Sequence, residues 1–176
     1  MKAIVYIATS LDGFIARKDG NIDWLISFES PEVFDRYNEF INIIDAIVIG
    51  RGTYEKVLSF SDWPYSKKVF VLSTTIKNIP DKLKEKVILI SMSPKEIISH
   101  LSNFGYSNIY IDGGKTIQNF LKEDLIDEMI ITKIPVLIGS GIPLFGHLEN
   151  DINFKHINTS VYPNGLVKSH YERKHN

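Results

Sequence analysis

The chain has 176 residues, about the length of a single domain, so we expect one domain over residues 1–176. Hydrophobic residues make up 44% of the sequence and charged residues 23%, a balance that excludes a disordered tail. The 20 basic and 21 acidic side chains leave a net charge of -1, which excludes a strong field for recruiting nucleic acid.

Cysteine is absent from the sequence, which excludes disulfides, thiolate metal sites and iron–sulfur clusters. The five histidines lack a ligand spacing such as H-E-x-x-H, so we expect no metal. The first apolar run is short, and no apolar stretch approaches the ~20 residues that a membrane span needs. These features predict a cytoplasmic protein without a membrane or nucleic-acid partner.

Apolar runs alternate with helix signals along most of the chain. The runs are nearly continuous and rich in β-favouring residues, which is typical of strands covered on both faces. Strands are predicted over residues 3–8, 46–49, 69–72, 87–90 and 109–111. Residues 9–21 are predicted to be a loop, and helices are predicted from Ser30-Pro31 onwards, over 53–58, after the capping box Ser93-Pro94-Lys95-Glu96, and over 117–122. This order predicts an α/β fold with a mostly parallel sheet.

The pattern changes after Asp127. Residues 129–138 and 153–159 are predicted to be β segments, with no clear helix between them. Pro163-Asn164-Gly165 predicts a hairpin with a type I′ turn, because Asn-Gly tolerates positive φ angles. The sheet is therefore expected to end in a C-terminal antiparallel hairpin, with seven or eight strands and about four helices in all.

Two glycine turns follow predicted strands, at residues 50–52 and 112–116. In an open α/β sheet, ligands bind beyond the carboxyl ends of the strands, where helix N-termini present unpaired amides to anions. Glycine lets the backbone approach a phosphate closely, while Arg51 and Lys115 add positive charge beside it. Two such turns suit a cofactor that contains a pyrophosphate.

Each turn taken alone is a weak motif. The first lacks the third glycine of the dinucleotide-binding fingerprint, and the second lacks the upstream glycine of a phosphate loop. Glycines that end strands also occur commonly in tight connections to a helix, with no ligand involved. Ser140 lies between glycines but outside a G-x-S-x-G motif, which argues against a hydrolase nucleophile.

Six blocks of the sequence occur in a recognisable order: residues 10–16, Trp24, and residues 49–55, 71–74, 111–116 and 135–145. Together they resemble the dihydrofolate reductase superfamily. The first and last blocks place the chain nearer the branch that contains the reductase domain of the riboflavin-biosynthesis enzyme RibD and its small stand-alone relatives. The resemblance spans nearly the whole chain and implies a dihydrofolate reductase-like, three-layer α/β/α fold. Residues 129–145 are unusually apolar, which fits either a homodimer interface, as in relatives of this branch, or plain burial in the core.

The resemblance also implies an NADPH site. Matching positions assign it Ala8, Ile15, Gly50, Arg51, Thr53, Ser73, Thr74, Gly113, Gly114, Lys115, Thr116 and Ile117. The residues themselves agree on the cofactor, because the strand over 69–72 ends in hydroxyl residues where an NAD site generally has an acidic residue for the ribose diol. These hydroxyls, with Lys77 nearby, favour a 2′-phosphate and hence NADPH.

The implied reaction is hydride transfer to the carbon of a C=N or C=O group. In the RibD branch the implied substrate is a phosphoribosylamino-pyrimidine, the substrate of 5-amino-6-(5-phosphoribosylamino)uracil reductase. In the folate branch it is a dihydropterin held by a carboxylate on the first helix. Phe34 occupies the matching position on the substrate side here, which argues against folate reduction unless Glu29, Glu32 or Asp35 takes this role. Dihydrofolate reductase and a non-catalytic NADP-binding or dimerisation module of the same fold remain the alternatives.

Three further residues are candidates for catalysis or substrate contact. Asp12 lies at the mouth of the loop after the first strand, where it either serves the reaction or stabilises a turn before Gly13. Trp24 either forms a wall of the pocket or packs beneath this loop. Thr132 matches a substrate-side threonine, but a β-branched residue also suits a strand for packing reasons alone.

Overall fold

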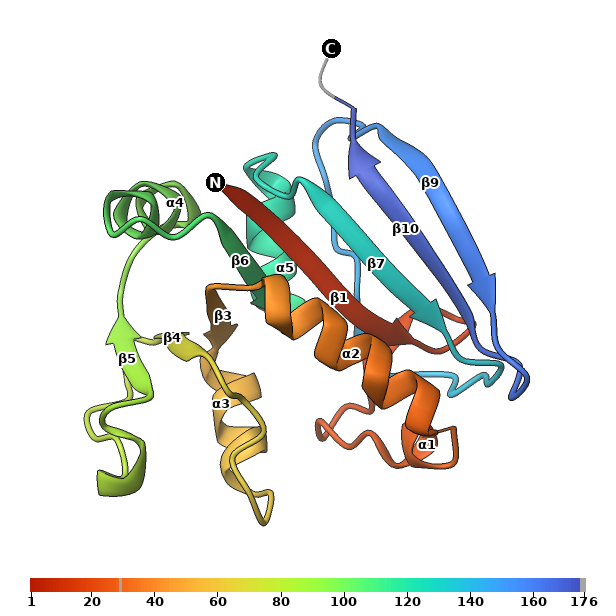
Figure 1. The fold of residues 1–176 in the computed structure, drawn as a ribbon, viewed down its shortest axis with the longest axis horizontal. Coiled ribbons are helices and arrows are strands. Elements are labelled where there is room, and N and C mark those ends of the chain that lie inside the picture. Colours follow the sequence, from red (N-terminus) through yellow and green to blue (C-terminus); the bar gives the residue numbers. More distant parts are fainter. Residues whose placement is uncertain (29, 175–176) are drawn as a thin grey trace.

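An eight-stranded sheet forms the centre of the molecule (Figure 1). The structure is a computed structural model, and it describes residues 1–28 and 30–174. The strand order across the sheet is β5-β4-β3-β6-β1-β7-β10-β9. These strands are β1 Lys2–Thr9, β3 Ala46–Gly50, β4 Lys68–Leu72, β5 Val87–Ile90, β6 Asn108–Asp112, β7 Glu128–Lys133, β9 Phe154–Val161 and β10 Val167–Arg173.

The first six strands of this order run parallel, whereas β10 is antiparallel to both β7 and β9. The prediction of a mostly parallel sheet that ends in a C-terminal antiparallel hairpin is therefore confirmed. The apolar runs of the sequence became strands because both faces of the parallel part are covered. In β3, for example, the side chains of residues 46–49 are fully buried.

Helices cover the sheet on both faces and divide the core into two clusters. Ile47, Ile49 and Tyr110 face α2 (Pro31–Ile43) and α3 (Arg51–Leu58). Val48 and Ile111 face α4 (Pro94–Asn103) and α5 (Gly114–Lys122). A one-turn helix, α1 (Asp23–Ile26), and a short 3-10 helix, η1 (Asp81–Leu83), lie outside these layers. The arrangement is a three-layer α/β/α sandwich, as expected. No helix within residues 1–28 and 30–174 combines the length and the apolar character needed to cross a membrane.

Local signals set the start of two helices. The Ser30 hydroxyl accepts a hydrogen bond from the amide of Val33 at the start of α2, with Pro31 at the first helical position. The predicted capping box forms at α4, where Ser93 and Glu96 cap each other's amides. The predicted starts of the other two helices were late by two and three residues, because α3 begins at Arg51 and α5 at Gly114.

Two short elements and one irregular segment were not predicted. The stretch expected to be a loop contains β2 (Phe14–Ala16), which pairs with β8 (Ile142–Pro143) in a separate two-stranded sheet. The predicted strand over residues 129–138 ends at Lys133. Pro135 has no amide to donate to a ladder, and the chain leaves the large sheet there to approach the loop after β1.

The C-terminal hairpin forms, but the prediction of its type I′ turn was wrong. Such a turn needs positive φ angles at both central residues, and proline fixes φ near −65° at Pro163. Of the three loop residues, Gly165 alone has a positive φ, of 85°. The amide of Gly165 donates to the carbonyl of Tyr162, and the Tyr162 amide donates to the carbonyl of Leu166. The loop is therefore a three-residue connection with glycine in the left-handed position.

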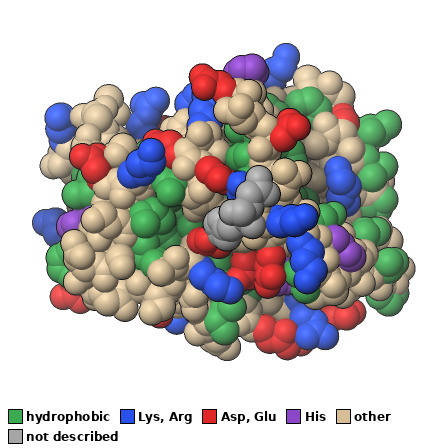
Figure 2. All heavy atoms as spheres, turned by 90° about the horizontal axis from the view of Figure 1, so that it is seen from above, with side chains coloured by type: hydrophobic (Ala, Val, Ile, Leu, Met, Phe, Trp, Pro, Cys, Tyr) green, Lys and Arg blue, Asp and Glu red, His purple; other side chains and the backbone are tan. Residues whose placement is uncertain are grey.

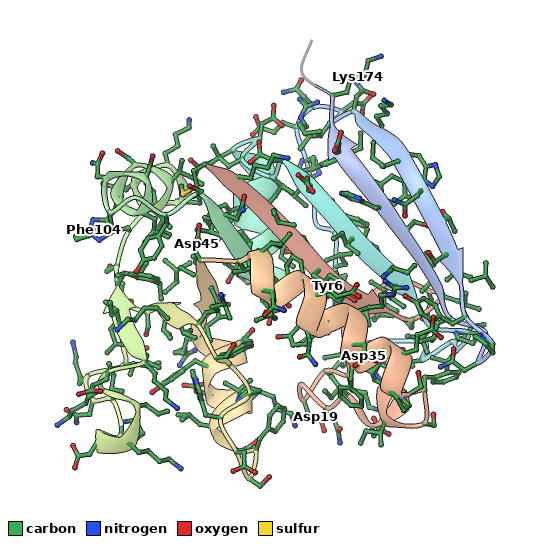
Figure 3. All side chains as sticks on the ribbon, viewed as in Figure 1. Tyr6, Asp19, Asp35, Asp45, Phe104 and Lys174 are labelled. Atoms are coloured by element: carbon green, nitrogen blue, oxygen red, sulfur yellow. The ribbon has the colours of Figure 1, made fainter. Side chains whose placement is uncertain are left out.

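Asp45 fastens the start of β3 to the start of β6 (Figure 3). Its Oδ2 accepts hydrogen bonds from the amides of Ser107, at 2.7 Å, and Asn108, at 2.8 Å. These bonds stabilise the ionised form and lower the pKa of Asp45 below its ordinary value. The contact ties together two strands that are neighbours in the sheet but distant in the sequence.

We expect Asp45→Ala to lower the free energy of unfolding at pH 7 by about 1 kcal/mol, at the low end for a charged acceptor because the carboxylate is exposed. Since the folded-state pKa is lowered, this stabilisation is present above the unfolded-state value of about 3.9 and is lost as the pH falls through the folded-state value. Urea unfolding from pH 7 down to pH 2 measures it. Asp81→Ala, which removes an exposed pair with Lys84, is the control. An equal loss in both variants would contradict the assignment.

Candidate functional site

Strand order brings the two glycine turns to one edge of the sheet. β3 and β6 are parallel neighbours, paired from Ala46 with Ile109 to Ile49 with Asp112, so their carboxyl ends lie side by side. After β3 the chain moves outward to β4 and β5, and it then returns through α4 to place β6 between β3 and β1. Such a change of direction is where open α/β sheets bind ligands.

The two helices that start at this edge have no side-chain cap. Gly50 is the N-cap residue of α3 and Gly113 that of α5, and neither helix start has a capping side-chain hydrogen bond. By contrast, α2 and α4 are capped by Ser30 and Ser93. The free amides in the first turns of α3 and α5 form adjacent anion-binding groups, reinforced by the helix dipoles.

The two turns interlock so closely that glycine is required at both N-cap positions. A Cβ atom on Gly50 would lie 2.8 Å from Oγ1 of Thr116, which belongs to α5. A Cβ atom on Gly113 would overlap the hydroxyl of Thr53, which belongs to α3, and Gly113 also has a φ of 93°. Each helix therefore presents a threonine to the glycine of the other turn, and the predicted Gly50, Thr53, Gly113 and Thr116 are brought together.

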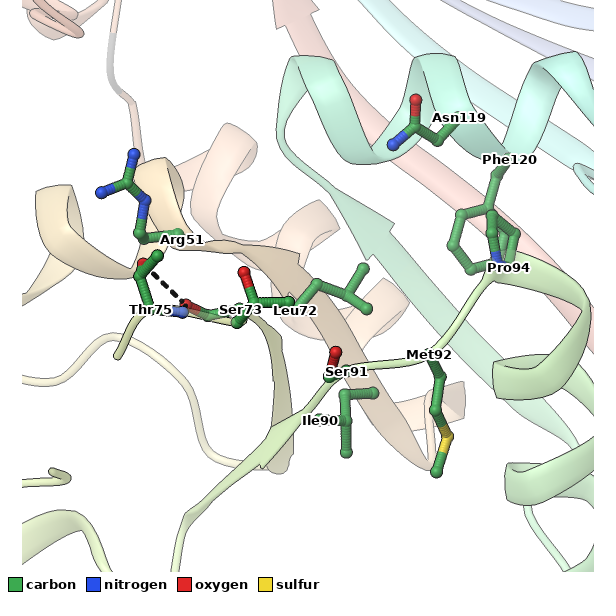
Figure 4. Close-up of a pocket in the computed structure, with 11 residues that line it drawn as sticks. Arg51, Leu72, Ser73, Thr75, Ile90, Ser91, Met92, Pro94, Asn119 and Phe120 are labelled. Atoms are coloured by element: carbon green, nitrogen blue, oxygen red, sulfur yellow. Dashed lines mark hydrogen bonds between the residues drawn. The ribbon is translucent and has the colours of Figure 1, made fainter. Parts of the chain in front are cut away.

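A hollow of about 400 Å³ opens beside the start of α3 (Figure 4). Its polar lining comes from Arg51, Ser73, Thr74, Thr75, Ser91 and Asn119, and its apolar lining from the ends of β4 and β5 and from α5. The Ser73 hydroxyl accepts hydrogen bonds from the amides of Thr75 and Ile76, which fixes the turn after β4. The described residues that line the hollow include no carboxylate. This donor set fits a phosphorylated nucleotide better than an unphosphorylated ribose diol.

Two positively charged side chains, Arg51 and Lys115, lie in the first turns of α3 and α5 at this edge of the sheet. The side chain of Arg51 is 56% exposed, and its guanidinium lies 3.7 Å from the carboxylate of Glu55, one turn along the same helix. An exposed pair at this distance is weak, so Arg51 can turn to an anion in the hollow at little cost. Lys115 is exposed in the first turn of α5. The charges and hydrogen-bond donors at this edge therefore suit a phosphorylated ligand such as NADPH.

The predicted nicotinamide and substrate positions lie toward the ends of β1 and β7. Ala8 pairs directly with Thr132 across these strands. Ala8 also packs in the small cluster around Trp24, whose side chain is buried and whose Nε1 has no hydrogen-bond partner among the described residues. Ile15 lies beside Gly114, where a Cβ atom would come within 3.1 Å of Ile15 Cδ1. Trp24 thus packs against Ile134, Tyr162 and Leu166, and its predicted role in the pocket stays a prediction.

Asp12 connects two loops. Its carboxylate accepts hydrogen bonds from the Ser10 hydroxyl and from the amides of Gly139, at 2.7 Å, and Ile138, at 3.3 Å. The bond from Ser10 contributes most to holding the pKa of Asp12 below its ordinary value, against a smaller desolvation effect. With its oxygens engaged and ionised, Asp12 is suited to holding the loops together rather than to donating a proton. Its catalytic role stays a prediction.

The predicted residues Phe34 and Ile117 differ in burial, and their roles in the site stay predictions. Phe34 is 52% exposed on α2, next to the exposed Glu32 and Asp35, and Glu29 lies outside the described residues. Ile117 is fully buried in the core, and its amide donates to the carbonyl of Gly113 within α5. Because the Ile117 side chain is buried and its amide is already hydrogen-bonded, this residue could contribute to a cofactor site only by packing.

Sequence reasoning missed one polar residue at this edge, Asp112, which was treated only as part of a turn. Asp112 is half-buried, and its carboxylate accepts hydrogen bonds from the Tyr65 hydroxyl, at 3.1 Å, and from the amide of Gly113, at 2.7 Å. Burial raises the pKa of Asp112 above its ordinary value, and these hydrogen bonds oppose the shift. An acidic residue at the end of an otherwise apolar strand was the available signal.

A second hollow, of about 610 Å³, lies over β7 and β10 on the same face of the sheet as α5. Its lining is mainly apolar and includes Leu121, Ile131, Phe145, Leu148 and Phe154, with Lys133 at its polar end. Neither of the uncapped helix starts lines it, and its hydroxyls come only from Ser169 and Tyr171 among the described residues, so we do not assign the cofactor to it. The homodimer expected from the resemblance stays a prediction.

The chain matches known proteins over most of its length. The model of the RibD C-terminal domain family matches residues 57–168. Uncharacterized protein YwjB of Bacillus subtilis (strain 168) is 41% identical over 175 residues, which cover 98% of each chain. A crystal structure from Shewanella sp. PV-4, described provisionally as a riboflavin biosynthesis protein, is 49% identical with a TM-score of 0.93 and covers 99% of this chain and 100% of that chain.

More distant structures share the fold. The deaminase and 5-amino-6-(5-phosphoribosylamino)uracil reductase from Thermotoga maritima has a TM-score of 0.77 at 18% identity, and the match covers 98% of this chain and 56% of that longer one. Dihydrofolate reductase from Enterococcus faecalis has a TM-score of 0.69 at 16% identity, over 99% of this chain and 97% of that chain. These matches confirm the predicted dihydrofolate reductase-like α/β/α fold. Because the family model covers more than half of the residues and the YwjB relative covers nearly all of them, the chain belongs to the RibD C-terminal domain family.

Proposed function

We propose that the chain is an NADPH-dependent reductase that acts on a small pyrimidine-type substrate, most like 5-amino-6-(5-phosphoribosylamino)uracil reductase. One observation carries this proposal: two uncapped helix N-termini lie side by side, locked by reciprocal glycine–threonine contacts, next to a hollow lined by Arg51 and hydroxyls. The likeness to the Thermotoga reductase and to a dihydrofolate reductase solved with NADP(H) supports it. When bound, NADPH supplies the hydride.

The cofactor would be held chiefly by backbone groups. The free amides of α3 and α5 would bind the pyrophosphate, and Arg51 would pair with the 2′-phosphate beside Ser73 and Thr74. The missing carboxylate in this lining favours NADPH over NADH, because an acidic side chain would repel the 2′-phosphate.

The substrate would lie on the α2 side of the sheet edge. Tyr110 and Asp112 are two positions apart on the strand β6, so their side chains point to the same face of the sheet. Tyr110 packs in the cluster beneath α2, and Asp112 therefore also faces α2. We infer that the Asp112 carboxylate, oriented by Tyr65 and Gly113, accepts a hydrogen bond from a hydroxyl or amino group of the substrate. Thr132 and Trp24 would line the remainder of this side with a hydroxyl and an indole donor.

The alternative of a dihydrofolate reductase needs an anion on α2. The matching residue is Phe34, and the neighbouring Glu32 and Asp35 are exposed on this helix. The half-buried carboxylate comes from β6 instead, which favours a substrate with hydroxyl groups over a pterin. A non-catalytic module of the same fold would bind NADPH and show no turnover.

The first prediction from the proposed function concerns the cofactor. We expect the protein to bind NADPH at least tenfold more tightly than NADH, because a charge-assisted contact with the 2′-phosphate contributes about 1.5 kcal/mol or more. Arg51→Ala should remove most of this difference and leave NADH binding nearly unchanged, as measured by calorimetry. Lys82→Ala, a change of an exposed lysine that does not line the hollow, is the matched control. Equal affinity of the wild type for the two cofactors would contradict the proposed 2′-phosphate contact.

The second prediction concerns the interlocked turns. Gly113→Ala should lower NADPH affinity at least tenfold, because the new methyl group overlaps Thr53 and displaces the start of α5. Gly105→Ala is the matched control, since Gly105 has a similar positive φ of 81° but no atom within 4 Å of the added Cβ. Both variants should lose stability in thermal melts, whereas only Gly113→Ala should lose NADPH affinity. Parallel loss of affinity in both would mean that backbone strain alone is responsible.

The third prediction concerns Asp112. Asp112→Asn should lower turnover of 5-amino-6-(5-phosphoribosylamino)uracil at least tenfold, measured by the loss of nicotinamide absorbance, and should leave NADPH affinity within about twofold. Because burial raises its pKa, the ionised carboxylate is lost as the pH falls through a value above the ordinary ~3.9 for Asp. Wild-type turnover should fall along this limb, and the Asn variant should lack it. An unchanged pH profile in the variant would remove Asp112 from the site, and NADPH binding without any turnover would favour the non-catalytic module.

A further inference from the structure

Three metal-ligating side chains meet at the end of the sheet opposite to the glycine turns, where β7 begins and β10 ends beside the chain termini (Figure 1). Glu128 and Glu172 are paired directly across these antiparallel strands. His170 lies two positions before Glu172, on the same face of the sheet. The end of the molecule seen in Figure 2 carries acidic side chains gathered beside lysine and arginine side chains.

The donor atoms of these residues are close enough to share one ion. Nε2 of His170 lies 3.0 Å from Oε2 of Glu128, and one ligand atom from each of the three residues lies within 4.8 Å of the others. Ligand atoms around a tetrahedral zinc ion are about 3.3 Å apart, as bonds of 2.0–2.2 Å require. The set therefore needs only small side-chain rotations, and the strand ladder already fixes its backbone.

The two carboxylate oxygens of Glu128 have different neighbours. Lys2 binds Oε1 of Glu128, at 2.5 Å, whereas Oε2 faces His170. The side chain of Lys2 is 58% exposed, compared with 13% for Glu128 and 23% for His170. Lys155 is paired opposite Glu172 on β9 and is the second cation near the cluster. Because the Lys2 side chain is mostly exposed, it can turn to solvent when a metal takes its place on Glu128.

We propose that Glu128, His170 and Glu172 bind one Zn²⁺ ion, with the remaining coordination position taken by water. The imidazole nitrogen favours zinc over Mg²⁺ and Ca²⁺, which prefer oxygen ligands alone. The ion would join β7 to β10 and so fasten the C-terminal hairpin to the parallel part of the sheet. The sequence spacing did not reveal this site, because its ligands alternate along one strand and come from a second strand instead of lying one turn apart on a helix.

Calorimetric titration of the chelator-treated protein with ZnCl₂ at pH 7 tests the proposal. We expect one Zn²⁺ per chain, an affinity at least tenfold weaker in His170→Ala and in Glu172→Gln, and no competition from excess MgCl₂. Lys2→Ala should strengthen binding about threefold, because the lysine competes for Glu128. His156→Ala is the matched control: His156 lies on the other strand of the hairpin, where its ring bonds the Thr159 hydroxyl. His175→Ala covers the histidine outside the described residues.

Thermal melting provides a second readout that does not depend on the cofactor site. Zinc should raise the melting temperature of the wild type and of His156→Ala, but not that of Glu172→Gln, and NADPH affinity should be the same with and without zinc. If His170→Ala does not fold, His170→Gln replaces it, with its fold checked by circular dichroism. Absence of saturable zinc binding, or an unchanged affinity in the His170 and Glu172 variants, would overturn the proposal.

Discussion

The candidate site depends on the parallel pairing of β3 with β6. This pairing places the starts of α3 and α5 next to each other, although β4, β5, α4 and β6 lie between the two helices in the sequence. The two starts are then locked by contacts in which Thr53 approaches Gly113 and Thr116 approaches Gly50. Without these glycines the helices cannot come close enough for their free amides to act on one ligand.

The same pairing separates the two sides of the site. β6 presents Ile109 and Ile111 to the core beneath α4 and α5, and it presents Tyr110 and Asp112 to the side of α2 and α3. A cofactor at the sheet edge would therefore meet a substrate held on one side only. The polar groups proposed for that side are Asp112, which Tyr65 and Gly113 hold in place, and Thr132. A small number of fixed polar groups suits the orientation of a substrate more than its tight binding.

If the proposed function holds, this chain would differ from a dihydrofolate reductase in the origin of the carboxylate that meets the substrate. The carboxylate belongs to β6 and is oriented by Tyr65 and Gly113, whereas α2 exposes Phe34, Glu32 and Asp35. Desolvation keeps the pKa of Asp112 raised, so its charge depends on what occupies the neighbouring space. Asp12, the acidic residue first favoured by the motif, bonds the loop before β2 to the loop before β8.

The sequence alone determined the α/β class, the main strands, the caps at Ser30 and Ser93, the antiparallel hairpin and the two glycine turns, because each of these depends on residues that are close together in the chain. It did not determine the turn type at Pro163, where the fixed φ of proline overrode the Asn-Gly signal. Only the tertiary structure decided that β3 and β6 are neighbours, that the chain leaves the sheet after Lys133, and that Asp112 is half-buried beside Tyr65. These features depend on contacts between distant residues, and local propensity and spacing carry no information about which distant strands will pair.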